Sequence, residues 1–340
     1  MMRYFWLMSF LLLASCSREP LVQSQSYVFG TLVDISVYGE TESRAREASN
    51  QIFQDFQQLH NQYHAWQTSS ELSQLNQAFA EGKTATIKPE LATMLKEASA
   101  LSVQSGGLFN PAIGSLIQAW GFQRDEFTPV EINAEAIRKL VEAKPAMTDI
   151  VLTGDKAYSK NPTVKLDLGG YAKGYALDRA AEKLHQFGIK KALVNIGGNI
   201  IAIGQHGNQP WRVGIQHPRQ PKPMATLDLA DGWAIGTSGD YQRYFEKEGK
   251  RYCHIIDPRT GYPAQNTQAV TVLIPPAKNA GVLSDVASKP IFIAASDQRV
   301  AAAQAMTIDN YLVVDAAGQV LVSDGMKQHV HWLVSPVFIQ

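Results

Sequence analysis

The stretch LDLGGYAKGYALD, residues 166–178, decides how the middle of the chain folds. Alternating apolar residues predict a strand over 164–168, and the apolar spacing after the two glycines predicts a helix over 172–187. Gly188 stands where a helix C-cap is expected. A glycine turn between a strand and a helix leaves bare amides at the helix N-terminus, and these favour a phosphate group. The spacing fits neither the GxGxxG fingerprint nor a Walker A loop, so a purely structural turn is the alternative.

Helix and strand patterns continue on both sides of this stretch. Before it, the sequence predicts a strand over 28–37, interrupted by Gly30, and helices over 42–61, 91–105 and 114–120. After it come strands over 192–196, 200–203, 211–216, 225–229, 270–274 and 311–314, with helices over 285–294, disturbed by Pro290, and 299–306. Helices and strands mix without a strict βαβ alternation, which indicates an α+β fold.

Composition and charge narrow the class of protein. The 340 residues are 45% hydrophobic and 18% charged, which suits one large domain or two intimate ones. Thirty-one basic residues balance thirty-one acidic ones without a Lys/Arg-rich run, so no nucleic-acid partner is predicted. Of the two cysteines, Cys253 lies in an apolar segment and has no partner for an internal disulfide once Cys16 is lipidated, so inert packing is expected.

The N-terminus carries the features of a secreted lipoprotein. Arg3 precedes an apolar run over 4–14, which is too short to span a membrane and is typical of a secretory signal, residues 1–15. The sequence Leu-Ala-Ser-Cys ending at Cys16 resembles a bacterial lipobox, which implies lipidation of Cys16. An ordinary signal peptide with a stray cysteine is the alternative. We expect a lipidated tether over 16–26, a single domain over 27–340, and an extracytoplasmic protein anchored to the outer membrane, because Ser17 carries no retention signal.

Two later segments bring titratable groups together. Residues 237–241 read TSGDY, and residues 254–263 read HIIDPRTGYP. An imidazole such as His254 can act as a general base near neutral pH, and an Arg can fix a phosphate. The sequence therefore indicates a site here, with Asp257 as the group that orients His254. A structural turn stapled by an Asp–Arg pair is the alternative.

Together these segments resemble the ApbE family of flavin transferases. The resemblance covers nearly everything after the tether. It rests on the two segments above, on residues 167–178, and on the sequences FGT (29–31), SELSQLN (70–76), GLFNP (107–111), WGF (120–122), VNIGGN (194–199) and SDGM (323–326).

The resemblance implies a fold, an activity and a set of site residues. It implies mainly antiparallel sheets with packed helices. The implied activity is Mg²⁺-dependent transfer of FMN from FAD to a Thr or Ser side chain through a phosphoester bond, with AMP released. The implied acceptor is a flavoprotein subunit of a membrane redox complex. The implied flavin contacts are Phe29, Trp66, Leu108, Phe109, Asn110, Asp167, Lys173, His254 and Ile255. The implied metal site comprises the Gly170 carbonyl, Asp285, Ser288 and Lys289. Phosphoryl transfer needs such positioning and charge stabilisation, and His254 is the candidate base.

The chain departs from the family pattern at several positions. Phe29, Trp66 and Asn110 stand where many relatives have Met, Tyr and Asp, and Asn199 where the residue is usually acidic. Lys289 stands where relatives have a Thr that ligates the metal, and an ammonium group has no lone pair to donate. FAD hydrolysis to FMN and AMP, or flavin binding without catalysis, are therefore alternative functions. The pairs His60/His64 and His329/His331 are assigned no function.

Overall fold

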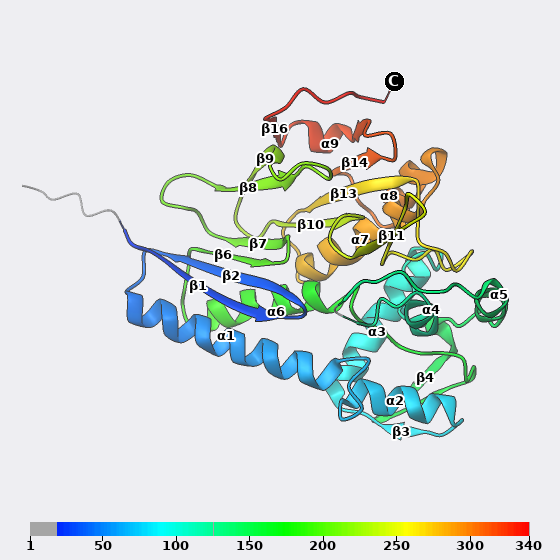
Figure 1. Ribbon diagram of the computed structural model, residues 1–340. Helices are drawn as coiled ribbons and strands as arrows, with labels where there is room; N and C mark the ends of the chain where they lie inside the picture. The colour runs from blue at the N-terminus through cyan, green and yellow to red at the C-terminus, as the bar shows by residue number, and fades with distance from the viewer. Residues whose placement is uncertain (1–18, 125, 340) are drawn as a thin grey trace, which may run out of the picture.

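An eight-stranded antiparallel sheet runs through the computed structural model, which describes residues 19–124 and 126–339 (Figure 1). Every neighbouring pair of strands in it is antiparallel, in agreement with the mainly antiparallel sheets that the resemblance implies. In spatial order the strands are β1 (Leu21–Val28), β2 (Thr31–Tyr38), β6 (Ala192–Ile196), β7 (Asn199–Ile203), β10 (Ala234–Gly239), β13 (Thr267–Ile274), β14 (Tyr311–Asp315) and β15 (Val320–Val322).

Both faces of this sheet are covered. One face packs against three helices, α1 (Glu42–Tyr63), α6 (Ala172–Gln186) and α7 (Ala280–Ile293), which enclose the main core. The other face packs a second core against a small sheet of β8 (Trp211–Gln216), β9 (Pro223–Leu229) and β16 (Val330–Trp332). Because β13 has cover on both sides, all eight of its residues are buried, and it has no solvent-exposed face.

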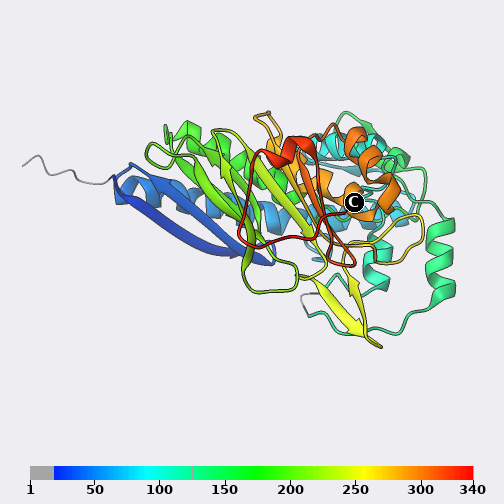
Figure 2. The ribbon, with the colours of Figure 1, turned by 90° about the horizontal axis from the view of Figure 1, so that it is seen from above.

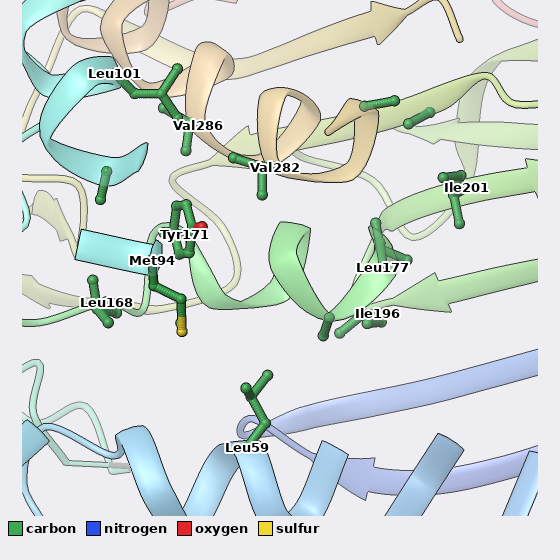
Figure 3. Packing of buried hydrophobic residues seen from close by; sticks show 14 of the residues in the cluster. Leu59, Met94, Leu101, Leu168, Tyr171, Leu177, Ile196, Ile201, Val282 and Val286 are labelled. Atoms are coloured by element: carbon green, nitrogen blue, oxygen red, sulfur yellow. The ribbon is translucent and has the colours of Figure 1, made fainter. Parts of the chain in front are cut away.

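The main core is densest where α6 and α7 meet. Figure 3 shows Val282 and Val286 of α7 pointing toward Tyr171, at the start of α6, while Leu177 of α6 lies nearer Ile196 and Ile201 of the sheet. Nearly every residue of α7 is buried, since the helix lies between α6 and the sheet. A helix buried on all sides is expected to be apolar, so the polar residues Asp285, Ser288 and Lys289 of α7 stand out. The crossing of these two helices positions the candidate site.

A mainly helical lobe lies beside the sheet. Its helices are α2 (Glu71–Ala80), α3 (Pro89–Gln104), α4 (Gly114–Ala119) and α5 (Ala134–Glu142), and a small sheet is formed by β3 (Ala85–Thr86), β4 (Ile150–Thr153) and β5 (Lys156–Ser159). The β11 (Tyr244–Lys247) and β12 (Lys250–Cys253) hairpin projects from the body (Figure 2) and contributes Phe245 to a third core around Trp120. The remaining helices are α8 (Arg299–Ala305), α9 (Asp324–Lys327) and two 3₁₀ turns, Met147–Asp149 and Ser296–Gln298.

The prediction for the N-terminal strand was wrong in its extent. Instead of one strand over 28–37, β1 and β2 form a hairpin in which Val28 pairs with Thr31. Its two turn residues, Phe29 and Gly30, have φ of 57° and 69°, as in a type I′ turn. The predicted tether over 16–26 is also wrong from residue 21 onward, because Leu21–Val28 is part of the sheet. Cys16 lies outside the described residues.

The predicted strand over 164–168 is not a regular strand either. This extended segment makes only an isolated bridge, between Ile113 and Lys165. A side chain completes the pairing instead: the Asn76 amide donates to the Leu166 carbonyl at 2.9 Å, and its oxygen accepts from the Leu166 amide at 2.6 Å. The Asn76 side chain thus makes the two backbone hydrogen bonds that a neighbouring strand would otherwise make with Leu166. No helix in the described part of the chain is both long and apolar enough to cross a membrane.

Candidate active site

The sequence stretch 166–178 leads directly into a close crossing of α6 and α7. A Cβ atom on Gly174 would lie 2.4 Å from the carbonyl oxygen of Gly281, and one on Gly281 would lie 2.5 Å from the carbonyl oxygen of Gly174. Glycine is therefore required at both positions because two backbones touch there. This contact explains the glycine inside the helix, where it weakens the local helical preference.

Each of the two helices supplies a carboxylate that caps the other. Asp178 of α6 accepts hydrogen bonds from the amides of Gly281 and Val282, at 2.7 and 2.9 Å, in the first turn of α7. Asp285 of α7 accepts one from the amide of Gly174, at 3.0 Å, in the first turn of α6. Neither N-cap residue caps its helix with its own side chain, so these carboxylates satisfy amides that would otherwise lack partners. Burial raises the pKa of Asp178 to about 7, against the effect of the two amides.

Two lysines converge on the Asp285 carboxylate. Lys289 Nζ lies 2.8 Å from Asp285 Oδ1 and Lys173 Nζ lies 3.6 Å from the same oxygen. Burial raises the pKa of Asp285, but Lys173, Lys289 and the Gly174 amide outweigh it, so that pKa lies below its ordinary value. Burial lowers the pKa of Lys289, and Asp285 opposes this. On the next turn, the Ser288 hydroxyl lies 2.8 Å from that of Ser238, in the TSGDY segment.

The GLFNP segment lies against the glycine turn. A Cβ on Gly170 would lie 2.9 Å from Lys289 Cε and 3.7 Å from the ring of Phe109, so the turn, the lysine and the aromatic ring are adjacent. Phe109 is buried and Leu108 packs against the same core. Asn110 stabilises the segment: its amide donates to the Pro145 carbonyl at 2.9 Å and its oxygen accepts from the Ala112 amide at 3.0 Å.

Trp66 and Asp167 form a second pair beside this turn. The indole Nε1 of Trp66 donates to Asp167 Oδ2 at 3.0 Å, while Asp167 Oδ1 accepts from the Gly169 amide at 2.7 Å. Lys165 Nζ lies 4.6 Å from the centre of the Trp66 ring, a cation–π contact. The Asp167 carboxylate thus holds both the Trp66 ring and the glycine turn in position.

Phe29 is held at the tip of the β1–β2 hairpin. A type I′ turn usually places Asn or Asp at this position, because a bulky residue with positive φ is strained. The ring of Phe29 packs 5.7 Å from that of Phe56 and 5.8 Å from that of His60, both on α1. Strain that persists in a folded protein is typical of functional positions.

His254 and Asp257 do not form the predicted pair. His254 Nδ1 lies 3.2 Å from the carbonyl oxygen of Arg243, and Asp257 instead makes a bidentate ion pair with Arg259, with a closest approach of 2.8 Å. The prediction that Asp257 orients His254 was wrong, and the alternative of a turn stapled by an Asp–Arg pair is correct for Asp257. Ile255 is buried, and its carbonyl accepts from the Ala264 amide.

Comparisons with known proteins identify the family of the chain. The model of the ApbE family matches residues 29–334. The chain belongs to the ApbE family. It is 39% identical over 91% of its length to an FAD:protein FMN transferase of Rhodobacter capsulatus, of which it spans 58%. It is 30% identical to a protein of the same name from Haemophilus influenzae, over 89% of both chains.

Two solved structures share the ApbE fold. The ApbE protein from Thermotoga maritima superposes with a TM-score of 0.82 at 28% identity, covering 91% of this chain and 99% of that one. The flavin transferase ApbE from Vibrio cholerae superposes with a TM-score of 0.78 at 26% identity, covering 92% and 99%. The α+β fold with mainly antiparallel sheets, predicted from the resemblance, is confirmed.

The structure links six of the fourteen site residues predicted from the sequence into one group of contacts, and it adds other residues. These six are Gly170, Phe109, Lys173, Asp285, Ser288 and Lys289, and the Ser288 hydroxyl joins the group by donating to the Asp285 carbonyl oxygen at 3.1 Å. Sequence reasoning missed Asp178 and Arg243. The sequence gives no sign that Arg243 contacts His254, because the contact is made by the backbone carbonyl of Arg243 and not by its side chain. Asp178 had a sequence signal, as an acidic residue beside Leu177 on the side of the helix that also carries Ala181.

Proposed function

We propose that this ApbE-family protein transfers the FMN half of FAD to a Thr or Ser hydroxyl of an acceptor flavoprotein subunit. The acceptor oxygen forms a bond to the phosphorus of the FMN half, the P–O bond to the AMP half breaks, and AMP leaves. The observation that carries this proposal is the match of residues 29–334 to the family, together with relatives named FAD:protein FMN transferase. The site geometry supports it, because two lysines and a glycine turn suit a diphosphate.

His254 is suited to accept the proton of the attacking hydroxyl. Because the Arg243 carbonyl can only accept a hydrogen bond, the 3.2 Å contact places the ring hydrogen on Nδ1 and leaves a lone pair on Nε2. Burial, and then the charges of Arg243, Lys173 and Lys289, lower the pKa of His254 to about 3. The imidazole is therefore neutral at physiological pH, with its Nε2 lone pair free. At this pKa it is a weak base in the protein alone, and the negative charge of a bound diphosphate beside Lys173 and Lys289 would raise its pKa toward the range that a general base needs.

Trp66, Phe29 and Phe109 suit the flavin and adenine rings. Trp66 is oriented by Asp167, and Phe29 is held by its turn. Aromatic side chains stack on planar rings at little entropic cost when they are already fixed. These residues are proposed to bind the rings, while the lysines bind the diphosphate between them.

The Mg²⁺ ion that the family implies does not fit these residues as they are arranged. Oxygen donors are present in Asp285, Ser288 and the Gly170 carbonyl. However, the Lys289 ammonium lies on the Asp285 carboxylate, and a charged lysine cannot ligate a metal. Among residues 19–124 and 126–339 no cluster of three or more His, Cys, Asp or Glu side chains could hold a metal ion. No step of the proposed transfer is therefore assigned to a metal.

The acceptor is proposed to be a subunit of a membrane redox complex on the extracytoplasmic side. The sequence supports this through its signal-like residues 1–15 and Cys16, which would carry the lipid anchor to the outer membrane. A lipid anchor would hold the enzyme near membrane-bound acceptors.

The decisive experiment is incubation of the purified protein with FAD and a candidate acceptor subunit, followed by mass spectrometry. A mass increase of one FMN phosphoester on an acceptor Thr or Ser, with AMP in solution, is expected. Free FMN and AMP with an unmodified acceptor would contradict transfer and identify an FAD pyrophosphatase. Bound but intact FAD would identify a flavin-binding protein without catalysis.

A further inference from the structure

Both oxygens of the Asp285 carboxylate already have partners in the protein. Oδ2 accepts from the Gly174 amide, and Oδ1 lies near both Lys289 and Lys173. Only 2% of the Asp285 side chain is exposed, so water does not replace these partners. A metal ion would have to displace one of them.

The position of Lys289 is fixed by three contacts, two with Asp285 and one with Gly170. Its ammonium donates to Asp285 Oδ1 at 2.8 Å and to the Asp285 carbonyl oxygen at 2.5 Å, within one turn of α7. Its stem passes Gly170, where even one added methyl group would lie 2.9 Å from Lys289 Cε. Its side chain is 16% exposed and its Cε lies beside Gly170, so a ligand on the glycine turn would lie next to the ammonium group.

The charges in this cluster do not cancel. Two ammonium groups share one carboxylate, so the group carries a net charge of one positive unit. A purely structural ion pair needs only one lysine. A half-buried surplus of positive charge beside a glycine turn is suited to an anion, and it repels a free divalent cation.

We infer that the Lys289 ammonium is the built-in cation of this site, and that with Lys173 it binds the diphosphate of FAD without a divalent metal. This inference rests on the proposed function only for the identity of the ligand. Lys289 is then a binding residue. It supplies the positive charge that a metal ion is expected to supply in other members of the family.

FAD affinity with and without metal tests this inference. The dissociation constant is measured by flavin fluorescence quenching in EDTA and in millimolar Mg²⁺, for the wild type, Lys289→Thr, Lys289→Arg and the control Lys183→Thr. Lys183 lies on α6, where it pairs with Asp55. The wild type, Lys289→Arg and Lys183→Thr should bind FAD with affinities that change less than about threefold between EDTA and Mg²⁺.

Lys289→Thr should behave differently. In EDTA it should lose about 10- to 100-fold in FAD affinity, because one charge-assisted hydrogen bond to the diphosphate is absent. Mg²⁺ should restore most of that loss, since Thr offers an oxygen ligand beside Asp285. Titration with Mn²⁺ without FAD, followed by electron paramagnetic resonance, should show tighter metal binding by Lys289→Thr than by the wild type.

Two results would overturn the inference. One is a wild-type FAD affinity that collapses in EDTA. The other is a Lys289→Thr affinity that equals the wild-type value in EDTA. If Lys289→Thr does not fold, Lys289→Arg and the wild-type EDTA measurement still decide. The experiment measures FAD binding, so it can be judged apart from the proposed function. If FAD binds without metal but no FMN is transferred, the proposed function fails and this inference stands. If FAD binding requires metal and FMN is transferred, this inference fails and the proposed function stands.

Discussion

Replacing Gly174 by Ala tests whether α6 and α7 touch as closely as described. The added Cβ would lie 2.4 Å from the Gly281 carbonyl oxygen and 2.7 Å from Val282 Cα. Carbon atoms pack best at about 3.5–4.0 Å, so the helices would have to separate by roughly 1 Å. Gly174 does not have a positive φ, so the contact, and not the backbone conformation, decides the outcome.

The expected loss of stability combines three effects. Overpacking a close contact costs about 1–3 kcal/mol. Separation by roughly 1 Å stretches the 3.0 Å hydrogen bond from the Gly174 amide to Asp285 beyond bonding distance, and a hydrogen bond to a charged group contributes about 1.5–3 kcal/mol. Alanine regains about 1 kcal/mol of helix propensity. The free energy of unfolding should therefore fall by about 1.5–5 kcal/mol.

Urea denaturation followed by circular dichroism measures this change. Glu182→Ala is the matched control, because Glu182 lies on the same helix with its side chain 57% exposed, and it should change the free energy by less than about 0.5 kcal/mol. FAD affinity should fall for Gly174→Ala as well, since Asp285 and Lys289 move with α7. A Gly174→Ala protein as stable as the wild type, or more stable by the helix-propensity gain, would refute the close crossing.

Three further predictions concern the site and the N-terminus. His254→Ala should lower the transfer rate by about 10²–10⁴-fold while FAD affinity stays within a few fold, and an unchanged rate would remove His254 from the mechanism. Because burial lowers the pKa of His254 from 6.5 to about 3, kcat/KM should show no ascending limb near pH 6.5; the same shift stabilises the fold above pH 6.5, and that stability is lost as pH falls toward 3. Cys16→Ser should release the protein from the membrane fraction, and equal fractionation of both proteins would contradict lipidation.

The longer amphipathic helices could be predicted because their periodicity records which face is buried. No helix was predicted over α2 or α5, and the predicted helix over 285–294 begins five residues after the first residue of α7, which is buried on nearly all sides. The 42–61 prediction differs from α1 by two residues at one end, and Gly188 follows α6 as expected. The β1–β2 hairpin was missed for a physical reason. Its turn is Phe29-Gly30, whereas the usual signal is Asn-Gly or Asp-Gly, so the pattern gave one interrupted strand.

The site could be predicted as a set of residues but not as a set of contacts. Asp257 and His254 are three residues apart in a Pro/Gly-rich loop, and spacing alone cannot show which way each side chain points. Asp257 pairs with Arg259 two residues further on, while His254 faces a carbonyl from the preceding strand region. In contrast, the consequence of Lys289 standing where relatives have Thr could be recognised from chemistry alone, because an ammonium group cannot ligate a metal.

The reciprocal capping of α6 and α7 explains why binding and stability depend on the same residues here. Asp285 at once caps α6 and orients both lysines, and Asp178 fixes the first turn of α7, whose later turn carries Asp285. A shift of either helix would therefore move the lysine charges relative to the Gly170 turn, and would also leave buried amides without acceptors. Such amides are costly, so the crossing resists small displacements. The cationic site is preorganised by the same hydrogen bonds that hold the core together, which reduces the entropy that ligand binding must overcome.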